Sequence, residues 1–276
     1  MFSTLIDVAT LSNHLSDPNW VIVDCRFRLQ NTMTGRHAYE QAHIPSAVYA
    51  HLDDDLSSAS PVTDAGRHPL PSPEQMTQLF SRLGITTGVQ VVIYDDFNHA
   101  FASRLWWMLH YMGHDAAAVL DGGWSAWVAA NGAQLSGVQE NKPAIFTPQR
   151  QTAQLVQIAQ VPHQTNLIDS RAPERYRGET EPLDPIAGHI PSAVNYFFTQ
   201  NLTTDGQFKS ADMINSQLAS LWPETGVPTF YCGSGVTACV NVLAATHAGL
   251  PRPKLYVGSW SEWCRTYPDS IEIGTN

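Results

Sequence analysis

Basic residues are scarce in this 276-residue chain, which carries 15 Lys and Arg against 25 Asp and Glu and a net charge of −10. This balance argues against nucleic acid as a partner, because a general nucleic-acid surface needs clustered cations to displace counterions from phosphates. Long apolar runs are also missing, and none approaches the roughly 18 residues of a membrane span. The N-terminus lacks the basic start and apolar core of a signal peptide, so we expect a cytoplasmic protein that binds no membrane.

Cysteine is scarce too. Cys25, Cys232, Cys239 and Cys264 are too few for a disulfide scaffold, and none stands in a C-x-x-C pair of the kind that indicates zinc or dithiol redox chemistry. We therefore expect neither a metal nor an organic cofactor, and at least one thiol that is available for chemistry.

What the chain does contain is an internal duplication, which takes precedence over any single motif. Four segments recur in the same order: VIVDCR (21–26) as NLIDSR (166–171), AHIPSAV (42–48) as GHIPSAV (188–194), VVIYD (91–95) as PTFYC (228–232), and LDGGWSAW (120–127) as YVGSWSEW (256–263). Four ordered matches in a chain of about two average domain lengths predict two tandem domains.

The expected boundaries follow from these matches. The first domain covers residues 1–132 and the second covers 153–276. Residues 133–152 between them are polar and rich in Pro and Gly, which is typical of a linker. The first copy carries extra residues in the turn-rich segment SSASPVTDAGRHPLP, which we interpret as a loop.

Within each copy, short β-branched runs alternate with helical patterns. VIVD and VVIY are typical of buried parallel strands, and SRLWWMLHYMG predicts an amphipathic helix that ends at Gly113. The second copy repeats the order with TFYC and then VTACVNVLAATHAG, ended by Gly249. Alternating strands and helices predict an α/β fold with a parallel sheet, and ligands of such sheets bind beyond the carboxyl ends of the strands. Cys232 stands at such an end.

The loop after this cysteine has the composition of an anion cradle. Gly233 and Gly235 allow the backbone to curl with its N–H groups inward, and a helix that starts near Thr237 adds its positive end. Both features favour the thiolate of Cys232 and lower the pKa of its thiol, so the sequence predicts a reactive nucleophile.

Three other interpretations of the loop compete. Gly233, Gly235 and Ala238 fit a dinucleotide fingerprint, but the acidic residue expected about 20 positions later is missing. A phosphatase would need an arginine to clamp phosphate at the position of Ala238. A cysteine beside an apolar strand is often an inert core residue, and the duplication and the glycines argue against that here. The first copy has Asp95 in place of Cys232, so we interpret Asp95 as a helix cap and expect one site per chain.

These segments together resemble the tandem rhodanese-domain sulfurtransferases, a family that includes thiosulfate sulfurtransferase and 3-mercaptopyruvate sulfurtransferase. The resemblance spans nearly the whole chain and depends on the paired segments and on CGSGVTA at 232–238, which looks like the mercaptopyruvate version of the loop. It implies an α/β fold of two tandem rhodanese-like domains, each a parallel sheet flanked by helices, with the first domain non-catalytic and the second catalytic.

The resemblance also implies the site residues. Cys232 is the persulfide carrier, and the donor pocket is lined by the loop residues Gly233, Ser234, Gly235, Val236 and Thr237. Arg175 matches the arginine that binds the anionic end of the donor, and a guanidinium fork suits a carboxylate or a sulfonate. The other interpretation of Arg175 is a surface salt bridge. Arg171, next to the strand end at Asp169, is interpreted as structural.

The choice of donor stays open. Thiosulfate enzymes typically carry basic residues directly after the cysteine, where this chain has Gly233 and Ser234. Mercaptopyruvate enzymes usually have a second arginine shortly after the first, and Leu183 stands in its place. The loop therefore favours mercaptopyruvate, and the missing arginine argues against it.

Several histidines and tryptophans remain to be placed. His68 and Asp53 match or neighbour a His and an Asp that the resemblance assigns to a proton relay with Ser234, and a polar loop across the domain interface is the alternative. Some histidines and tryptophans occur at matching positions in both copies, including the copy that lacks the cysteine. We therefore interpret them as residues that fix turns or pack in the core: His43, His189, Trp124, Trp127, Trp260 and Trp263.

The sequence thus predicts a sulfurtransferase. The thiolate of Cys232 takes sulfur from a small anionic donor, 3-mercaptopyruvate or thiosulfate, and passes it to a thiophilic acceptor such as cyanide, a small thiol or a thioredoxin-like protein. The alternative is a rhodanese-like module that carries sulfur or binds a partner without turnover, and the intact loop favours the enzyme.

Overall fold

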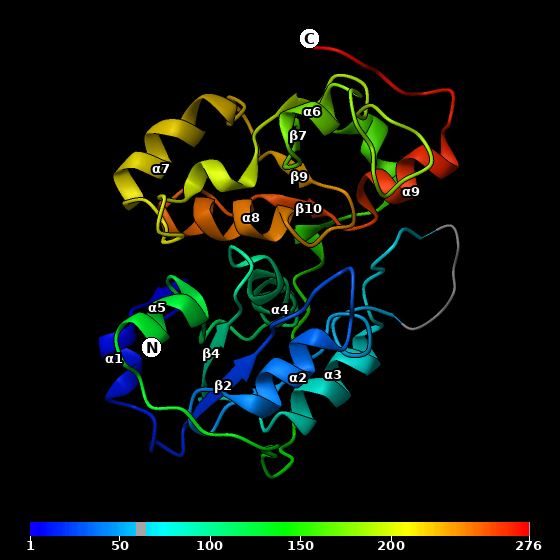
Figure 1. Ribbon diagram of the computed structural model, residues 1–276. Helices are drawn as coiled ribbons and strands as arrows, with labels where there is room; N and C mark the ends of the chain where they lie inside the picture. The colour runs from blue at the N-terminus through cyan, green and yellow to red at the C-terminus, as the bar shows by residue number, and fades with distance from the viewer. Residues whose placement is uncertain (59–64, 276) are drawn as a thin grey trace. The chain divides into compact units, whose positions relative to one another are not determined.

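The computed structural model describes residues 1–58 and 65–275 of the chain. These residues form two units, which the colours of Figure 1 let the reader follow along the chain. The first unit contains residues 1–58, 70–151 and 204–207, and the second contains 65–69, 152–203 and 208–275. Residues 65–69 belong to the loop that the sequence assigns to the first copy, yet they are part of the second unit. The expected linker residues up to 151 belong to the first unit.

Each unit is built on one five-stranded parallel sheet. The strand order in the first is β1-β5-β4-β2-β3, and in the second it is β6-β10-β9-β7-β8, so the two sheets have the same topology. The strands of the first unit are β1 (Leu5–Ile6), β2 (Trp20–Asp24), β3 (Val48–Tyr49), β4 (Gln90–Tyr94) and β5 (Ala117–Leu120). Those of the second are β6 (Leu155–Val156), β7 (Leu167–Asp169), β8 (Val194–Asn195), β9 (Thr229–Tyr231) and β10 (Lys254–Tyr256).

Helices connect the strands, as parallel pairing requires. The first unit has α1 (Val8–Ser12), α2 (Thr34–Gln41), α3 (Pro73–Arg82), α4 (Ala100–Tyr111) and α5 (Gly123–Ala129). The second has α6 (Pro173–Tyr176), α7 (Ala211–Leu218), α8 (Ala238–His247) and α9 (Ser259–Thr266), with short 3₁₀ turns at η1 (Thr152–Gln154), η2 (Ile158–His163), η3 (Phe198–Asn201) and η4 (Ala219–Leu221). The α/β fold of two parallel sheets flanked by helices is confirmed.

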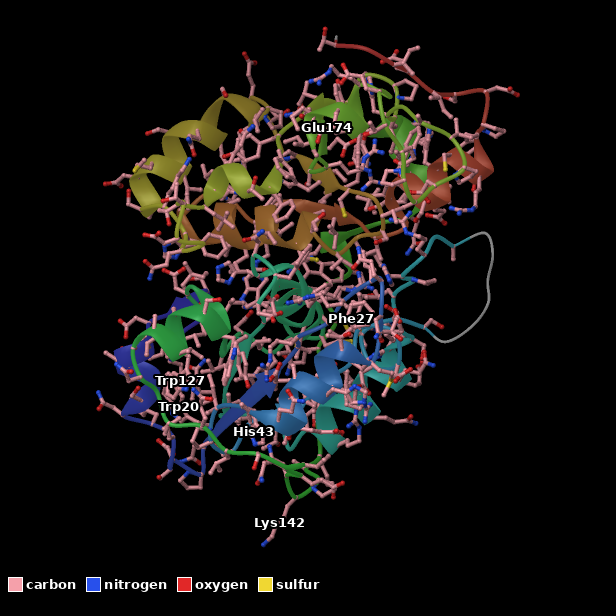
Figure 2. The ribbon with its side chains drawn as sticks, in the orientation of Figure 1. Trp20, Phe27, His43, Trp127, Lys142 and Glu174 are labelled. Atoms are coloured by element: carbon pink, nitrogen blue, oxygen red, sulfur yellow. The ribbon has the colours of Figure 1, made fainter. Side chains whose placement is uncertain are left out.

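Alternating strand residues bury both faces of each sheet. In β2, Ile22 contributes to the core that also holds Trp127 of α5, with Trp20 packed against it (Figure 2). In the second unit, Tyr231 faces a core formed with Trp260 and Trp263 of α9. The four paired tryptophans are therefore packing residues, as expected.

The helix α4 differs from its prediction. All twelve of its residues are buried, so it has no solvent face and is not amphipathic. The polar residues that suggested such a face have partners inside the unit. The guanidinium of Arg104 donates to the carbonyl of Leu56 at 3.3 Å, and Nδ1 of His110 lies 2.9 Å from Oδ1 of Asp115.

A buried ion pair ends the same strand in both units. Arg26 contacts Asp24 at 2.6 Å just after β2, and Arg171 contacts Asp169 at 2.6 Å just after β7. Each guanidinium also donates to a main-chain carbonyl at 2.6 Å and lies over a tryptophan ring. The structural role expected of Arg171 is confirmed by these contacts. Burial raises the pKa of Asp24 despite its arginine, which shows how costly an unpaired charge would be here.

We expect Asp24→Ala to lower the free energy of unfolding by about 3–5 kcal/mol, because it leaves the Arg26 charge buried without its partner. Asp96→Ala is the matched control, since it breaks the half-exposed pair of Asp96 with Arg28 in the same unit and should cost about 1 kcal/mol or less. Chemical denaturation measures both. Equal losses in the two variants would contradict this account.

Candidate active site

Cys232 directly follows β9, the central strand of the second sheet. Its N–H donates to Oγ of Ser259 at 3.1 Å, and its carbonyl accepts from the N–H of Trp260 at 3.0 Å. Both partners begin α9, so the main chain is fixed on either side of the sulfur. The side chain is only 1% exposed. It lies at the carboxyl end of a parallel sheet, where α/β proteins bind their ligands.

The loop after Cys232 turns its donors toward the sulfur. Sγ accepts hydrogen bonds from the hydroxyl of Thr237 and from the N–H groups of Ser234, Val236 and Ala238. Burial by itself raises the pKa of this thiol, but these donors stabilise the thiolate and leave the pKa below its ordinary value. The set of donors extends one residue beyond the predicted Thr237, into the first turn of α8.

Two glycines give the loop its shape. Gly235 has φ of +73°, and a Cβ there would lie 2.3 Å from the carbonyl oxygen of Val257, so no other residue fits. At Gly233 the atoms that a side chain would meet are the guanidinium nitrogens of two arginines. A Cβ there would lie 2.8 Å from Nη2 of Arg67 and 3.5 Å from both terminal nitrogens of Arg175.

The corresponding loop of the first unit binds a carboxylate in place of a thiolate. Oδ1 of Asp95 accepts from the N–H groups of Phe97 and His99, and Oδ2 accepts from those of Phe101 and Ala102. The helix-capping role expected of Asp95 is confirmed. Burial raises the pKa of Asp95, against the opposing effects of His99 and the amides. Both loops thus direct several amides at one side chain.

The arginines near Gly233 share one buried carboxylate. Arg175 of α6 contacts Oε1 of Glu181 at 2.6 Å, and its distance to Oδ2 of Asp184 is 3.7 Å. Arg67 is hydrogen-bonded to the same Oδ2. Arg175 therefore forms salt bridges with buried carboxylates, not the surface salt bridge of its alternative interpretation, and its guanidinium also faces the loop. Its part in binding the donor stays a prediction. In Figure 2 the label of Glu174 marks this part of α6.

His68 is placed beside the loop. Its Nδ1 lies 2.8 Å from Oγ of Ser234, and both side chains are buried in the second unit. The expected pairing of His68 with Ser234 is therefore present in the structure. Asp53 belongs to the first unit and is partly exposed. Its part in a proton relay stays a prediction.

Three residues of this region were missed in the sequence. Arg67 and Asp184 are far apart in the sequence and form an ion pair in the structure. The one feature of the sequence that pointed to such a pair was the scarcity of charged residues around the loop. Ser259 had a clearer signal, because the duplication aligns it with Gly123. Both have φ of +55°, and the serine holds this strained conformation while its Oγ binds the N–H of Cys232.

The remaining predicted residues have structural roles. Nδ1 of His43 lies 2.8 Å from the carbonyl of Tyr39, and Nδ1 of His189 lies 2.8 Å from that of Tyr176. Each imidazole also stacks on the same tyrosine, so the pair fixes the same turn in both units, as expected.

The other three cysteines differ from Cys232. Burial raises the pKa of Cys25 and of Cys264, and Sγ of Cys239, in the first turn of α8, donates to the carbonyl of Gly235 in the preceding loop at 3.3 Å. Among the described residues, no group of three or more His, Cys, Asp or Glu side chains is arranged to hold a metal ion. No helix in that part of the chain is long and apolar enough to cross a membrane.

Fold and site define a two-domain α/β protein with one cysteine-centred anion cradle. The model of the Rhodanese-like domain matches the chain twice, at residues 7–130 and 151–266. The chain therefore belongs to the rhodanese family.

Its relatives carry two kinds of name. The "Probable 3-mercaptopyruvate sulfurtransferase" of Pseudomonas aeruginosa is 42% identical over 267 residues, which is 94% of each chain. The thiosulfate sulfurtransferase of Rattus norvegicus is 31% identical over 267 residues, covering 93% of this chain and 89% of the relative. The solved structure of 3-mercaptopyruvate sulfurtransferase from Leishmania major superposes with a TM-score of 0.86 at 32% identity, over 98% of this chain and 76% of that one.

The Thr237 hydroxyl provides a direct test of the cradle. We expect Thr237→Val to shift the alkylation of Cys232 by iodoacetamide to higher pH, because losing this donor raises the thiol pKa and the thiolate then forms only at higher pH. Thr246→Val is the control, since its hydroxyl binds the carbonyl of Val242 near the other end of α8. An unshifted alkylation profile in Thr237→Val would show that the hydroxyl does not stabilise the thiolate.

Proposed function

We propose that this chain is a sulfurtransferase in which Cys232 carries sulfur as a persulfide between a small anionic donor and a thiophilic acceptor. The observation that carries the proposal is the set of four hydrogen-bond donors directed at Sγ, which lowers the pKa of a buried thiol. The names of the relatives, which include both mercaptopyruvate and thiosulfate enzymes, support the same reaction.

With thiosulfate, the Cys232 thiolate attacks the outer sulfur. The new S–S bond forms as the bond between the two sulfur atoms of the donor breaks, and sulfite leaves with the electron pair of that bond. The persulfide keeps the single negative charge of the thiolate. The amides that stabilise the thiolate are in place to stabilise this charge one atom further out.

With 3-mercaptopyruvate, the thiolate attacks the thiol sulfur and the C–S bond breaks. Pyruvate leaves as its enolate, and the proton of the donor thiol is transferred to the carbon that lost sulfur. The pair of His68 and Ser234, 2.8 Å apart, is suited to move this proton. The bound persulfide then passes its outer sulfur to cyanide or a thiolate, which restores the Cys232 thiolate.

The setting of this chemistry is part of the proposal. All four cysteines are free thiols, and unpaired cysteines suit a reducing compartment, so we place the activity in the cytoplasm. Small thiols and thioredoxin-like proteins are acceptors that such a compartment supplies. No group other than the protein side chains and the two substrates is needed to balance the reaction.

Mass spectrometry of the intact protein tests the carrier. Incubation with either donor should add about 32 Da, one sulfur atom, and Cys232→Ser should abolish both this addition and turnover. Cys264→Ala is the control and should retain both. If Cys232→Ser still transfers sulfur, the proposal is wrong; if wild type binds sulfur but never releases it to an acceptor, the chain is a carrier and not an enzyme.

His68→Gln tests the proton relay. With 3-mercaptopyruvate we expect kcat to fall by about 100-fold, the lower end of the range for general acid–base catalysis, and its pH profile to lose one titration. Thiosulfate needs no proton for its leaving group, so its kcat should fall much less. His163→Gln, on an exposed residue of the same unit, is the control. Equal losses with both donors and an unchanged pH profile would identify His68 as a purely structural residue.

A further inference from the structure

The loop of Cys232 adjoins a cluster of four arginines and three carboxylates in a chain that is negative overall. Arg171 forms ion pairs with both Asp169 and Glu181, and its side chain is 1% exposed. Asp184, which is nearly inaccessible, is shared by the other three arginines: Arg67, Arg175 and Arg265. Glu181, equally buried, pairs with Arg175 as well as with Arg171. Four guanidinium groups thus face three carboxylates, so this cluster carries one positive charge beside the loop, before the charge of a Cys232 thiolate is counted. An anionic donor would be attracted to this surplus.

Arg67 is held at the loop from two directions. Its main-chain N–H donates to Oγ of Ser261 at 3.0 Å, and its Nη1 donates to the buried Asp184. The next residue, His68, contacts Ser234. The side chain of Arg67 is still 22% exposed, so the guanidinium is fixed without being enclosed.

The second terminal nitrogen of this guanidinium, Nη2, occupies the space that a side chain at residue 233 would fill. Nη2 of Arg67 would be 2.8 Å from a Cβ placed on Gly233, and both terminal nitrogens of Arg175 would be 3.5 Å from it. Two guanidinium groups, from distant segments, therefore meet at the residue that follows the nucleophile.

We propose that Arg67 is a donor-binding and specificity-determining residue, which forms with Arg175 a two-guanidinium clamp for the oxyanion end of the donor. This inference rests on the proposed sulfurtransferase function and names how its donor is bound. The clamp takes a sulfonate bonded directly to the transferred sulfur or a carboxylate separated from that sulfur by two carbons. Arg67 supplies the second cation that Leu183, 45% exposed, does not provide.

Thiosulfate and 3-mercaptopyruvate both carry an oxyanion that the clamp can bind. They differ in the distance between this oxyanion and the transferred sulfur, so we expect the two arginines to contribute differently to the binding of each donor. The sulfonate of thiosulfate is bonded directly to the transferred sulfur, so it lies close to Gly233, where Arg67 makes the nearest approach. The carboxylate of 3-mercaptopyruvate is two carbons further away. We therefore expect Arg67→Met to impair thiosulfate more than 3-mercaptopyruvate.

The test compares Arg67→Met with Arg265→Met. Both variants remove one positive charge from Asp184, but Arg265 binds the other oxygen, Oδ1, from α9. For Arg67→Met we expect kcat/KM to fall by about 10- to 100-fold with thiosulfate, mainly through KM, as for the loss of a charged hydrogen bond. Arg265→Met should stay within about 3-fold of wild type by the same scale. Arg67→Lys should recover part of the loss, because it keeps the charge and loses the fork.

A second measurement separates the clamp from sulfur transfer. Iodoacetate and iodoacetamide alkylate the same sulfur and differ in one negative charge, so the ratio of their rates at Cys232 reports the clamp without any turnover. Arg67→Met should lower this ratio about 10-fold and leave the iodoacetamide rate nearly unchanged, which also shows that the variant is folded. If Arg67→Met fails to fold, Arg67→Lys should still show a smaller ratio than wild type.

The outcomes are distinct. An unchanged ratio together with an unchanged KM in Arg67→Met overturns the clamp, and so does an equal effect of Arg265→Met, because the role of Arg67 would then be to position Asp184. If wild type forms no persulfide, the proposed function fails on its own, and the alkylation ratio still decides whether Arg67 and Arg175 bind an anion.

Discussion

The contact on which the whole site depends is that between the sulfur of Cys232 and the donors of the loop that follows it. Removing a thiolate from water is unfavourable, and the sulfur of Cys232 is almost completely buried. The three amides and one hydroxyl replace the lost water with fixed dipoles, which need no reorganisation when a negative charge forms on the sulfur. Everything else in the second unit can be understood as what holds these donors in place.

Three contacts hold them there. Gly235 passes so close to the carbonyl of Val257 that only a glycine fits, and its left-handed backbone turns the next amides inward. The start of α9 fixes Cys232 through Ser259 and Trp260. Ser259 accepts an unfavourable φ because its Oγ satisfies a buried N–H that would otherwise have no partner. The strain is local, and it fixes the position of Cys232.

The sequence was informative wherever the chain repeats itself and poor wherever distant segments meet. The duplication made it possible to predict the parallel strands, the position of Cys232 after β9 and the capping role of Asp95. Residues present in both copies are those that the fold requires, and residues present in one copy are candidates for a function of that copy. The burial of α4 could not, since periodicity counts Arg104 and His110 as exposed and cannot show partners such as Leu56. Arg67 was missed for the same reason: its partners at Asp184, Ser261 and Gly233 lie more than a hundred residues away.

The two loops also explain why one cysteine suffices. In the first unit the carboxylate of Asp95 already accepts from four amides of its loop and helix, so these four donors are not available to an exogenous anion. The next residue is Asp96, whose charge is balanced by Arg28. In the second unit the corresponding residue is Gly233, and the charges nearest to it are the cations Arg67 and Arg175. A thiolate can form a bond to a second sulfur atom, and its negative charge then lies on that second atom. A carboxylate cannot, so the same backbone device caps a helix in one unit and can hold a nucleophile in the other.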